Sequence, residues 1–119
     1  MPRARLSLLL LVTLLPAALA PCGAEARQAR CVIRQNGAVA YAGSCQFTPD
    51  KGGSFSIRSR TARPILPNIS DVSVDVISAG NAEVRGLTTG GNQSRWGPAV
   101  RSKRDPACWT GADFEVCAY

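Results

Sequence analysis

The chain has 119 residues, which gives room for one domain, with a formal net charge of +6 and no histidine. The absence of histidine removes the commonest general base and the commonest metal ligand of enzymes. Because no other titratable side chains form a supported group, we predict that the chain is not an enzyme and has no catalytic residue, no metal site and no cofactor.

The N-terminal segment has the pattern of a signal peptide. Arg3 and Arg5 precede an apolar run from Leu6 to Leu15, and small residues follow that run. The run is too short to span a bilayer comfortably, which argues against a membrane anchor. We therefore expect an exported protein, periplasmic or secreted, with no transmembrane segment after cleavage.

Two small-residue motifs compete as the cleavage site. Cleavage after Ala20 would place Pro21 directly after the scissile bond, where its fixed φ and missing N–H are unfavourable. Cleavage after Ala26 avoids this, and the choice between the two sites stays open. The favoured site divides the chain into a signal peptide, residues 1–26, and a single small β domain, residues 27–119.

Downstream of the leader, turn residues alternate with short β-branched runs, and no window repeats apolar residues at helical spacing. Asn36–Gly37 predicts a hairpin turn, because a type I′ turn needs positive φ at both central positions. Val72, Val74 and Val76 alternate with polar residues and are expected to face the core. The expected strands are 30–35, 39–42 with its continuation 45–48 past a bend or bulge at Gly43, 54–58, 72–76 and 82–87. Residues 96–100 form a short strand or a covering segment, and a terminal hairpin follows from residue 108.

The connections complete this pattern. Two prolines make residues 59–68 irregular, and residues 88–94 form a polar, glycine-containing loop. Six to seven short strands without an internal repeat predict an all-β fold, a small antiparallel sandwich or barrel.

Cysteine usage indicates that this fold is stapled by two disulfides. Removal of Cys22 with the leader leaves an even number, which in a short exported chain indicates a disulfide framework. Pairing of near neighbours is favoured over the crossed pairings, which stay open. The local pairs are Cys31–Cys45 and Cys108–Cys117. The first of them needs a bulge near Gly43 to bring its two cysteines opposite each other. The spacing contains no C-x-x-C pair, which argues against zinc. The four framework residues are Cys31, Cys45, Cys108 and Cys117.

Charge indicates a candidate binding surface. The leader carries Arg3, Arg5 and Glu25, a net +1, so the rest of the chain carries +5. Arginine pairs bidentately with carboxylates and phosphates, and tryptophan stacks on rings. We expect an anionic envelope component or an acidic protein as partner, and no nucleic acid. In the alternative interpretation, the two tryptophans are core residues beneath solvated charges. The candidate residues are Arg95, Trp96, Arg101, Lys103 and Arg104.

Several short segments of the mature part carry a family resemblance. They are Gly43-Ser44-Cys45-Gln46-Phe47, Gly52-Gly53-Ser54-Phe55-Ser56-Ile57, Arg101 ahead of Ala107-Cys108-Trp109, and Val116-Cys117-Ala118. With them the chain resembles small exported bacterial domains of uncharacterised function, which sometimes follow a lysozyme-inhibitor-like domain in longer proteins. The resemblance implies shared turns, strands and disulfides, and it implies no catalytic residue.

Two function classes follow. The first is an exported, non-catalytic binding module of the cell envelope or secreted space that recognises an anionic partner. The alternative is an inhibitor of a hydrolase, lysozyme-type or other. A net charge of +5 argues against a basic lysozyme as the target, because like charges slow encounter, but not against an acidic hydrolase.

We predict that the exported protein begins at Arg27. The intact mass of protein recovered after export should equal that of residues 27–119 with two disulfides, and N-terminal sequencing should give Arg-Gln-Ala. A mature chain that retains Cys22 would contradict this prediction.

Overall fold

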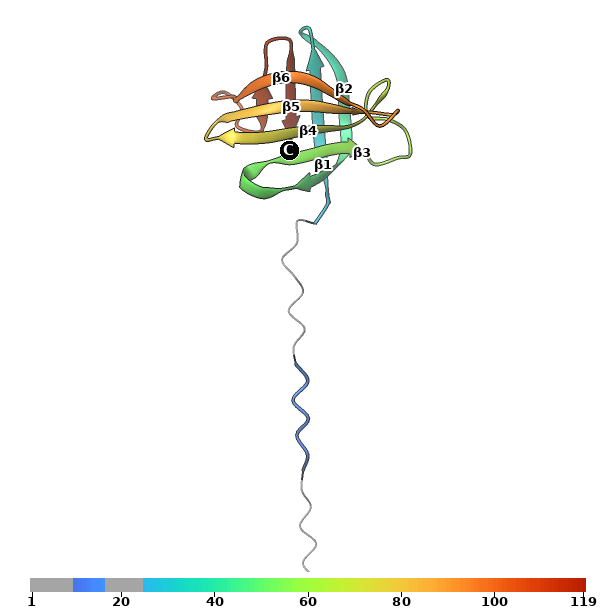
Figure 1. The fold of residues 1–119 in the computed structure, drawn as a ribbon, viewed down its shortest axis with the longest axis vertical. Helices are drawn as coiled ribbons and strands as arrows, with labels where there is room; N and C mark the ends of the chain where they lie inside the picture. The colour runs from blue at the N-terminus through green and yellow to red at the C-terminus, as the bar shows by residue number, and fades with distance from the viewer. Residues whose placement is uncertain (1–9, 17–24) are drawn as a thin grey trace, which may run out of the picture.

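The computed structural model describes residues 10–16 and 25–119 (Figure 1). The earlier cleavage motif and Cys22 lie outside the described residues. Residues 10–16 form no regular secondary structure, and the first strand begins at Arg27. In the described part of the chain, no helix is long and apolar enough to cross a membrane. The signal peptide and its cleavage site stay predictions.

The described domain is an antiparallel barrel in which each strand pairs with the next and β8 pairs back onto β1. The predicted all-β antiparallel class is therefore confirmed, as a barrel of eight strands rather than six or seven. A single short 3-10 turn, η1, lies between β2 and β3. The elements are β1 (Arg27–Gln35), β2 (Ala38–Pro49), η1 (Lys51–Gly53), β3 (Phe55–Ser59), β4 (Ile69–Ser78), β5 (Asn81–Thr88), β6 (Gln93–Arg101), β7 (Cys108–Thr110) and β8 (Phe114–Ala118).

The observed strands are longer than expected where hydrogen bonds to a neighbouring strand extend them. The expected second strand, 39–42 continuing as 45–48, runs through Gly43 without a break, because Gly43 pairs with Cys31 in the ladder. The expected loop at 88–94 is shorter, since β6 already begins at Gln93. Ladder hydrogen bonds with the preceding strand decide both points, since Gly43 pairs with Cys31 and Gln93 pairs with Leu87.

Side chains alternate between the interior of the barrel and the solvent, as strand geometry requires. Val72 and Val74 are fully buried, as predicted, and Val76 is partly buried against the same core. The irregular segment after β3 folds inward, so that Ile65 and Leu66 are 3% and 4% exposed. These two residues pack against the core cluster and help to fill one end of the barrel.

The β1–β2 hairpin shows how the first disulfide forms. Asn36 and Gly37 make the predicted turn with φ of 51° and 78°. A register shift between Ile33 and Arg34 leaves Ala40 without a partner and places Cys31 opposite Gly43. The bulge that this pairing requires is therefore present, but it lies at Ala40, nearer the turn than the predicted position near Gly43. Cys31 and Cys45 become diagonal neighbours on the inner face, with a Cα–Cα distance of 5.8 Å. Diagonal neighbours at this separation are within reach of a disulfide.

The second disulfide joins directly opposed residues of β7 and β8. Cys108 pairs with Cys117 in the ladder, with a Cα–Cα distance of 4.0 Å. These two residues cluster with Val32, apart from the main core. The favoured local pairing is therefore confirmed for both bridges. The first bridge joins β1 to β2, and the second joins β7 to β8. One bridge therefore lies on each side of the β1–β8 pairing, the seam that closes the barrel.

Removing either disulfide should destabilise the barrel by about 2–5 kcal/mol. The Cys31→Ala/Cys45→Ala pair should lose more than the Cys108→Ala/Cys117→Ala pair, because its loop is longer, 14 against 9 residues, and because it also empties space inside the core. Urea unfolding of both double variants measures the difference. Equal or reversed losses, or free thiols at all four positions in exported protein, would contradict this prediction.

Candidate functional site

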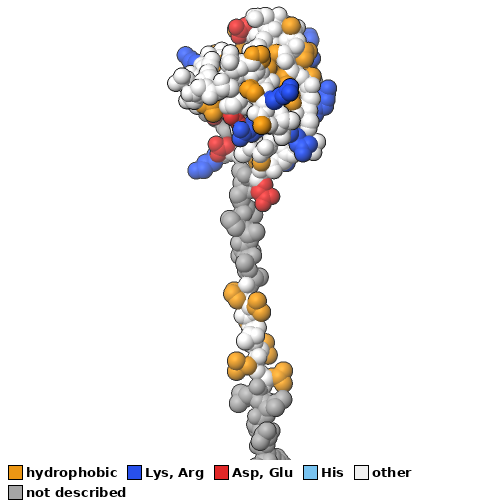
Figure 2. Space-filling view, turned by 90° about the vertical axis from the view of Figure 1, so that its right-hand side faces the viewer, with side chains coloured by type: hydrophobic (Ala, Val, Ile, Leu, Met, Phe, Trp, Pro, Cys, Tyr) orange, Lys and Arg blue, Asp and Glu red, His pale blue; other side chains and the backbone are white. Residues whose placement is uncertain are grey.

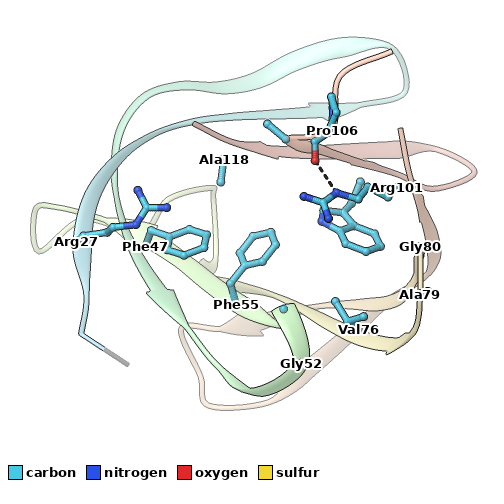
Figure 3. A pocket seen from close by; sticks show the side chains of 13 residues that line it. Arg27, Phe47, Gly52, Phe55, Val76, Ala79, Gly80, Arg101, Pro106 and Ala118 are labelled. Atoms are coloured by element: carbon cyan, nitrogen blue, oxygen red, sulfur yellow. Dashed lines mark hydrogen bonds between the residues drawn. The ribbon is translucent and has the colours of Figure 1, made fainter. Parts of the chain in front are cut away.

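A cavity of about 440 Å³ opens at the end of the barrel where β1 begins and β8 ends (Figure 3). Its wall is made by strand ends, by the turns after β2 and β4, and by the loop between β6 and β7. This volume falls in the range of small-molecule sites, about 300–1,000 Å³. In small barrels of this kind the mouth is a common ligand site.

Arg27 occupies an inward-facing position of β1 at this mouth. Ala29, Cys31 and Ile33 follow at two-residue spacing and are buried in the core. Arg27 stands opposite Phe47 in the β1–β2 ladder, and its guanidinium carbon lies 4.4 Å from the centre of that ring. The sequence therefore places a cation at the top of an otherwise apolar row, where its guanidinium remains exposed.

Arg101 occupies the corresponding position of β6. It follows buried Ala99 at two-residue spacing and stands opposite Trp109 in the β6–β7 ladder. Its guanidinium carbon lies 5.7 Å from the centre of the indole. The Nε–H of Arg101 donates to the carbonyl of Pro106 at 2.7 Å, so the guanidinium is held at the rim. Both arginines thus use the same arrangement, an inward position opposite an aromatic ring.

The rings beneath the two cations form an aromatic floor. Phe47 and Phe55 stack with centroids 4.9 Å apart and an interplanar angle of 24°. Phe55 and Trp109 are 7% and 5% exposed. In Figure 3 Arg27 with Phe47 and Arg101 lie on opposite sides of the cavity, with Phe55 between them. The mouth therefore combines flat apolar surfaces with two flanking positive charges.

The β6–β7 loop carries two further cations to this end. The Ser102 hydroxyl accepts hydrogen bonds from the N–H groups of Arg104 and Asp105 at 3.2 Å each. The Asp105 carboxylate accepts from the N–H of Ala107 at 3.1 Å and from the Tyr119 hydroxyl. These contacts fix the loop backbone, while the side chains of Lys103 and Arg104 remain exposed.

The five predicted site residues are not all brought together. Arg101, Lys103 and Arg104 gather at the open end, whereas Arg95 lies six residues earlier in β6, about 20 Å away along the strand. The Arg95 guanidinium pairs with Glu83; this hydrogen bond lowers the pKa of Glu83 and raises that of Arg95.

The two tryptophans occupy opposite ends of the barrel. Trp96 lies at a register shift in β6, and its ring packs edge-on against Phe114 with centroids 5.6 Å apart. It lies beside the hairpin turns at the end of the barrel opposite the cavity, which Ile65 and Leu66 help to fill and which is called the filled end below. Trp96 is partly buried against the core cluster, and Trp109 is a member of it. The alternative interpretation, that the tryptophans are core residues, therefore holds for Trp109, although its ring also lines the cavity.

Ion pairing separates four surface arginines from the others, which include the two at the mouth. On the outer surface, acidic partners lie close to these four, in the pairs Arg34–Glu115, Arg58–Asp71, Arg85–Asp75 and Arg95–Glu83. Within residues 10–16 and 25–119, no carboxylate lies within 4.0 Å of the charged nitrogens of Arg27 or Arg101. Figure 2 shows basic side chains spread over one face of the barrel among apolar and uncharged ones. The cations at the mouth therefore keep their charge available to a partner.

The sequence prediction missed the contribution of Arg27, Phe47 and Phe55. The available signal was the two-residue alternation running from Arg27 into the buried row of β1, which became visible only once the strand was known to begin there. The matching signal for Arg101 is its spacing from Ala99.

One group of potential metal ligands occurs among the described residues. Cys108, Glu115 and Cys117 have ligand atoms within 4.8 Å of one another. The two sulfur atoms form a disulfide, and thiolates are the cysteine form that binds metals. This group therefore offers a single carboxylate.

The described domain is thus a small closed antiparallel barrel with a ligand-sized, cationic and aromatic opening at one end. Comparisons with protein-family models, with curated proteins and with solved structures give no match to this chain.

The hydrogen bond from Tyr119 to Asp105 should be visible in a tyrosine titration, because this bond raises the pKa of Tyr119. The difference in 295 nm absorbance between the wild type and Tyr119→Phe should show a step above the ordinary value of about 10. Asp105→Asn should return the step toward that value. The stabilisation from this bond is present at pH values below the unfolded-state pKa and is lost as the pH rises through the raised value. An unchanged step in Asp105→Asn would contradict the assignment.

Proposed function

We propose that this chain is an exported, non-catalytic binding protein that takes an anionic partner of the cell envelope or secreted space at the open end of its barrel. The observation that carries the proposal is the pair of guanidinium groups, Arg27 and Arg101, each held over an aromatic ring at the rim of one cavity.

Both arginines have the properties of anion-binding groups. Stacking on Phe47 and Trp109 orders the side chains before a partner arrives, which lowers the entropy cost of binding. The bond from Nε of Arg101 to Pro106 leaves the terminal amino groups of that guanidinium to donate to a carboxylate or phosphate. Lys103 and Arg104 add charge on the adjoining loop and favour encounter with an anion.

The chemistry of the lining supports a binding role rather than catalysis. The cavity wall contains no carboxylate, hydroxyl or thiol among the described residues that form it. Nucleophilic and acid–base catalysis need such groups in contact with the reacting atoms. Two acidic residues that adjoin lining segments in the sequence have structural partners: Asp105 binds within its loop, and Asp50 accepts from the N–H of Lys51 at 2.7 Å.

Export is supported by the two disulfides. Both bridges form within a domain of 93 residues, which has a modest core for its surface. Stable disulfides of this kind are typical of oxidising compartments.

Binding to anionic surfaces tests the proposal. The exported chain is titrated with anionic lipid vesicles, peptidoglycan and an acidic polysaccharide at 0.1 M and 1 M salt. We expect binding to at least one of them that weakens steeply with salt, because the Debye length falls from about 10 Å to 3 Å. Arg27→Gln/Arg101→Gln should weaken it about tenfold or more, equivalent to about 1.4 kcal/mol.

The chain offers a matched control for the loss of charge. Arg60 and Arg63 are exposed on the connection after β3, at the opposite end of the barrel, so Arg60→Gln/Arg63→Gln removes the same net charge away from the cavity. This variant should retain binding within about threefold, since exposed, unspecific charge contributes little. Equal losses in the two variants would show that only net charge matters, and the absence of all binding would refute the proposal.

A further inference from the structure

We infer that the cavity at the open end selects a compact anion with a flat apolar ring, such as an aryl carboxylate, in preference to a sugar acid or a long-chain fatty acid. This inference rests on the proposed function and names the small ligand that enters the cavity, whereas vesicles and polymers meet the exposed charges of its rim, Arg101, Lys103 and Arg104. Three properties of the cavity carry it: the kind of hydrogen-bonding groups in its wall, the shape of its apolar surface and its depth.

The side chains of the wall offer hydrogen-bond donors and no acceptors. Among the described residues that line the cavity, only Arg27, Arg101 and Trp109 have polar side-chain atoms, and all of these atoms are N–H donors. A carboxylate is an acceptor only, so it matches these donors. The hydroxyl groups of a sugar also donate, and the acceptors that the described lining offers them are backbone carbonyls, such as those of Gly52, Gly53 and Gly80. The side chains of the wall therefore fit a carboxylate better than a ring of hydroxyls.

The apolar part of the wall is flat. Phe47 and Phe55 form a stacked pair, and the ring of Trp109 lies beneath Arg101. Arg27 and Phe55 both lie against Phe47, and Arg101 lies over Trp109. A planar ligand ring therefore meets the edges and the uncovered faces of these rings, with which it can make offset-stacked or edge-to-face contacts. The two guanidinium groups lie on opposite sides of this surface in Figure 3, where an anionic substituent at the edge of a ring could reach one of them. Of the two, Arg101 is the better carboxylate partner, because Pro106 already orients its guanidinium.

The depth of the cavity excludes a long chain. Beneath the mouth the interior is occupied by fully buried side chains, including Ile33, Ile57 and Val74, and by the Cys31–Cys45 disulfide. A fatty acid that extended along the barrel axis would have to displace this core, and close-packed interiors do not yield that space at low cost. A bicyclic ring is short enough to remain within the mouth.

Calorimetric titration of the exported, disulfide-bonded chain tests the inference with four probes. They are 2-naphthoate, its neutral counterpart 2-naphthylmethanol, the sugar acid glucuronate and the chain acid decanoate. We expect 2-naphthoate to bind at least tenfold more tightly than each of the other three. Arg101→Gln should weaken 2-naphthoate binding at least tenfold, whereas Arg60→Gln/Arg63→Gln should leave it unchanged within threefold.

The two tryptophans supply a readout that needs no variant. In an amide-correlation NMR spectrum of the wild type, 2-naphthoate should shift the indole N–H signal of Trp109, at the mouth, and leave that of Trp96, at the filled end, in place. A shift confined to Trp96 would overturn the inference. This measurement also stands if Arg101→Gln fails to fold.

The outcomes separate this inference from the proposed function. Glucuronate or decanoate binding as tightly as 2-naphthoate, and depending on Arg101, would overturn the ligand class while the anion-binding function stood. Equal binding of 2-naphthylmethanol would show that the arginines do not select an anion, which also overturns it. If neither the probes nor the vesicles and polymers bound, both proposals would fail.

Discussion

The pairing of β1 with β8 is the contact on which the rest of the structure depends. It joins the two ends of the domain, so it has the largest separation in sequence of any strand pair, and it converts a meander into a closed barrel. Closure gives each described strand a neighbour on both sides, which is how barrels limit the edges that could pair with other chains. The two disulfides stand on either side of this seam and restrict the strands that must meet there. In a domain with a modest core, they stabilise the contact that costs most chain entropy.

Closure also creates the candidate site. Arg27 belongs to β1 and Arg101 to β6, and their aromatic partners belong to β2 and β7. These strands surround one mouth only because β8 returns to β1. At the other end, Ile65, Leu66, Phe114 and Trp96 occupy the interior, so the barrel offers a single shallow opening of this composition among its described residues. A rigid wall with ordered cations is the kind of surface on which binding requires little reorganisation.

The distribution of charge follows the same geometry. On the outer surface Arg34, Arg58, Arg85 and Arg95 have acidic partners, and such exposed pairs contribute little to stability. At the mouth, Arg27 and Arg101 face rings instead of carboxylates. A count of charges along the sequence cannot distinguish these groups. The candidate residues chosen from the sequence therefore included Arg95, which is paired with Glu83, together with residues of the mouth.

Local signals in the sequence determined the all-β class, the Asn36–Gly37 turn and the buried face at Val72 and Val74, and they favoured the two short-range disulfides without excluding the crossed pairings. Each of these depends on residues close together in the chain, where spacing and backbone preference act directly. The structure decided the number of strands, the register that makes Cys31 and Cys45 diagonal neighbours, and the grouping of Arg27 with Arg101. The register depends on a one-residue shift inside the β1–β2 hairpin, which spacing alone does not place. The grouping of the arginines depends on which distant strands exchange hydrogen bonds, because the two-residue alternation of a strand acquires an inside and an outside only when the barrel closes.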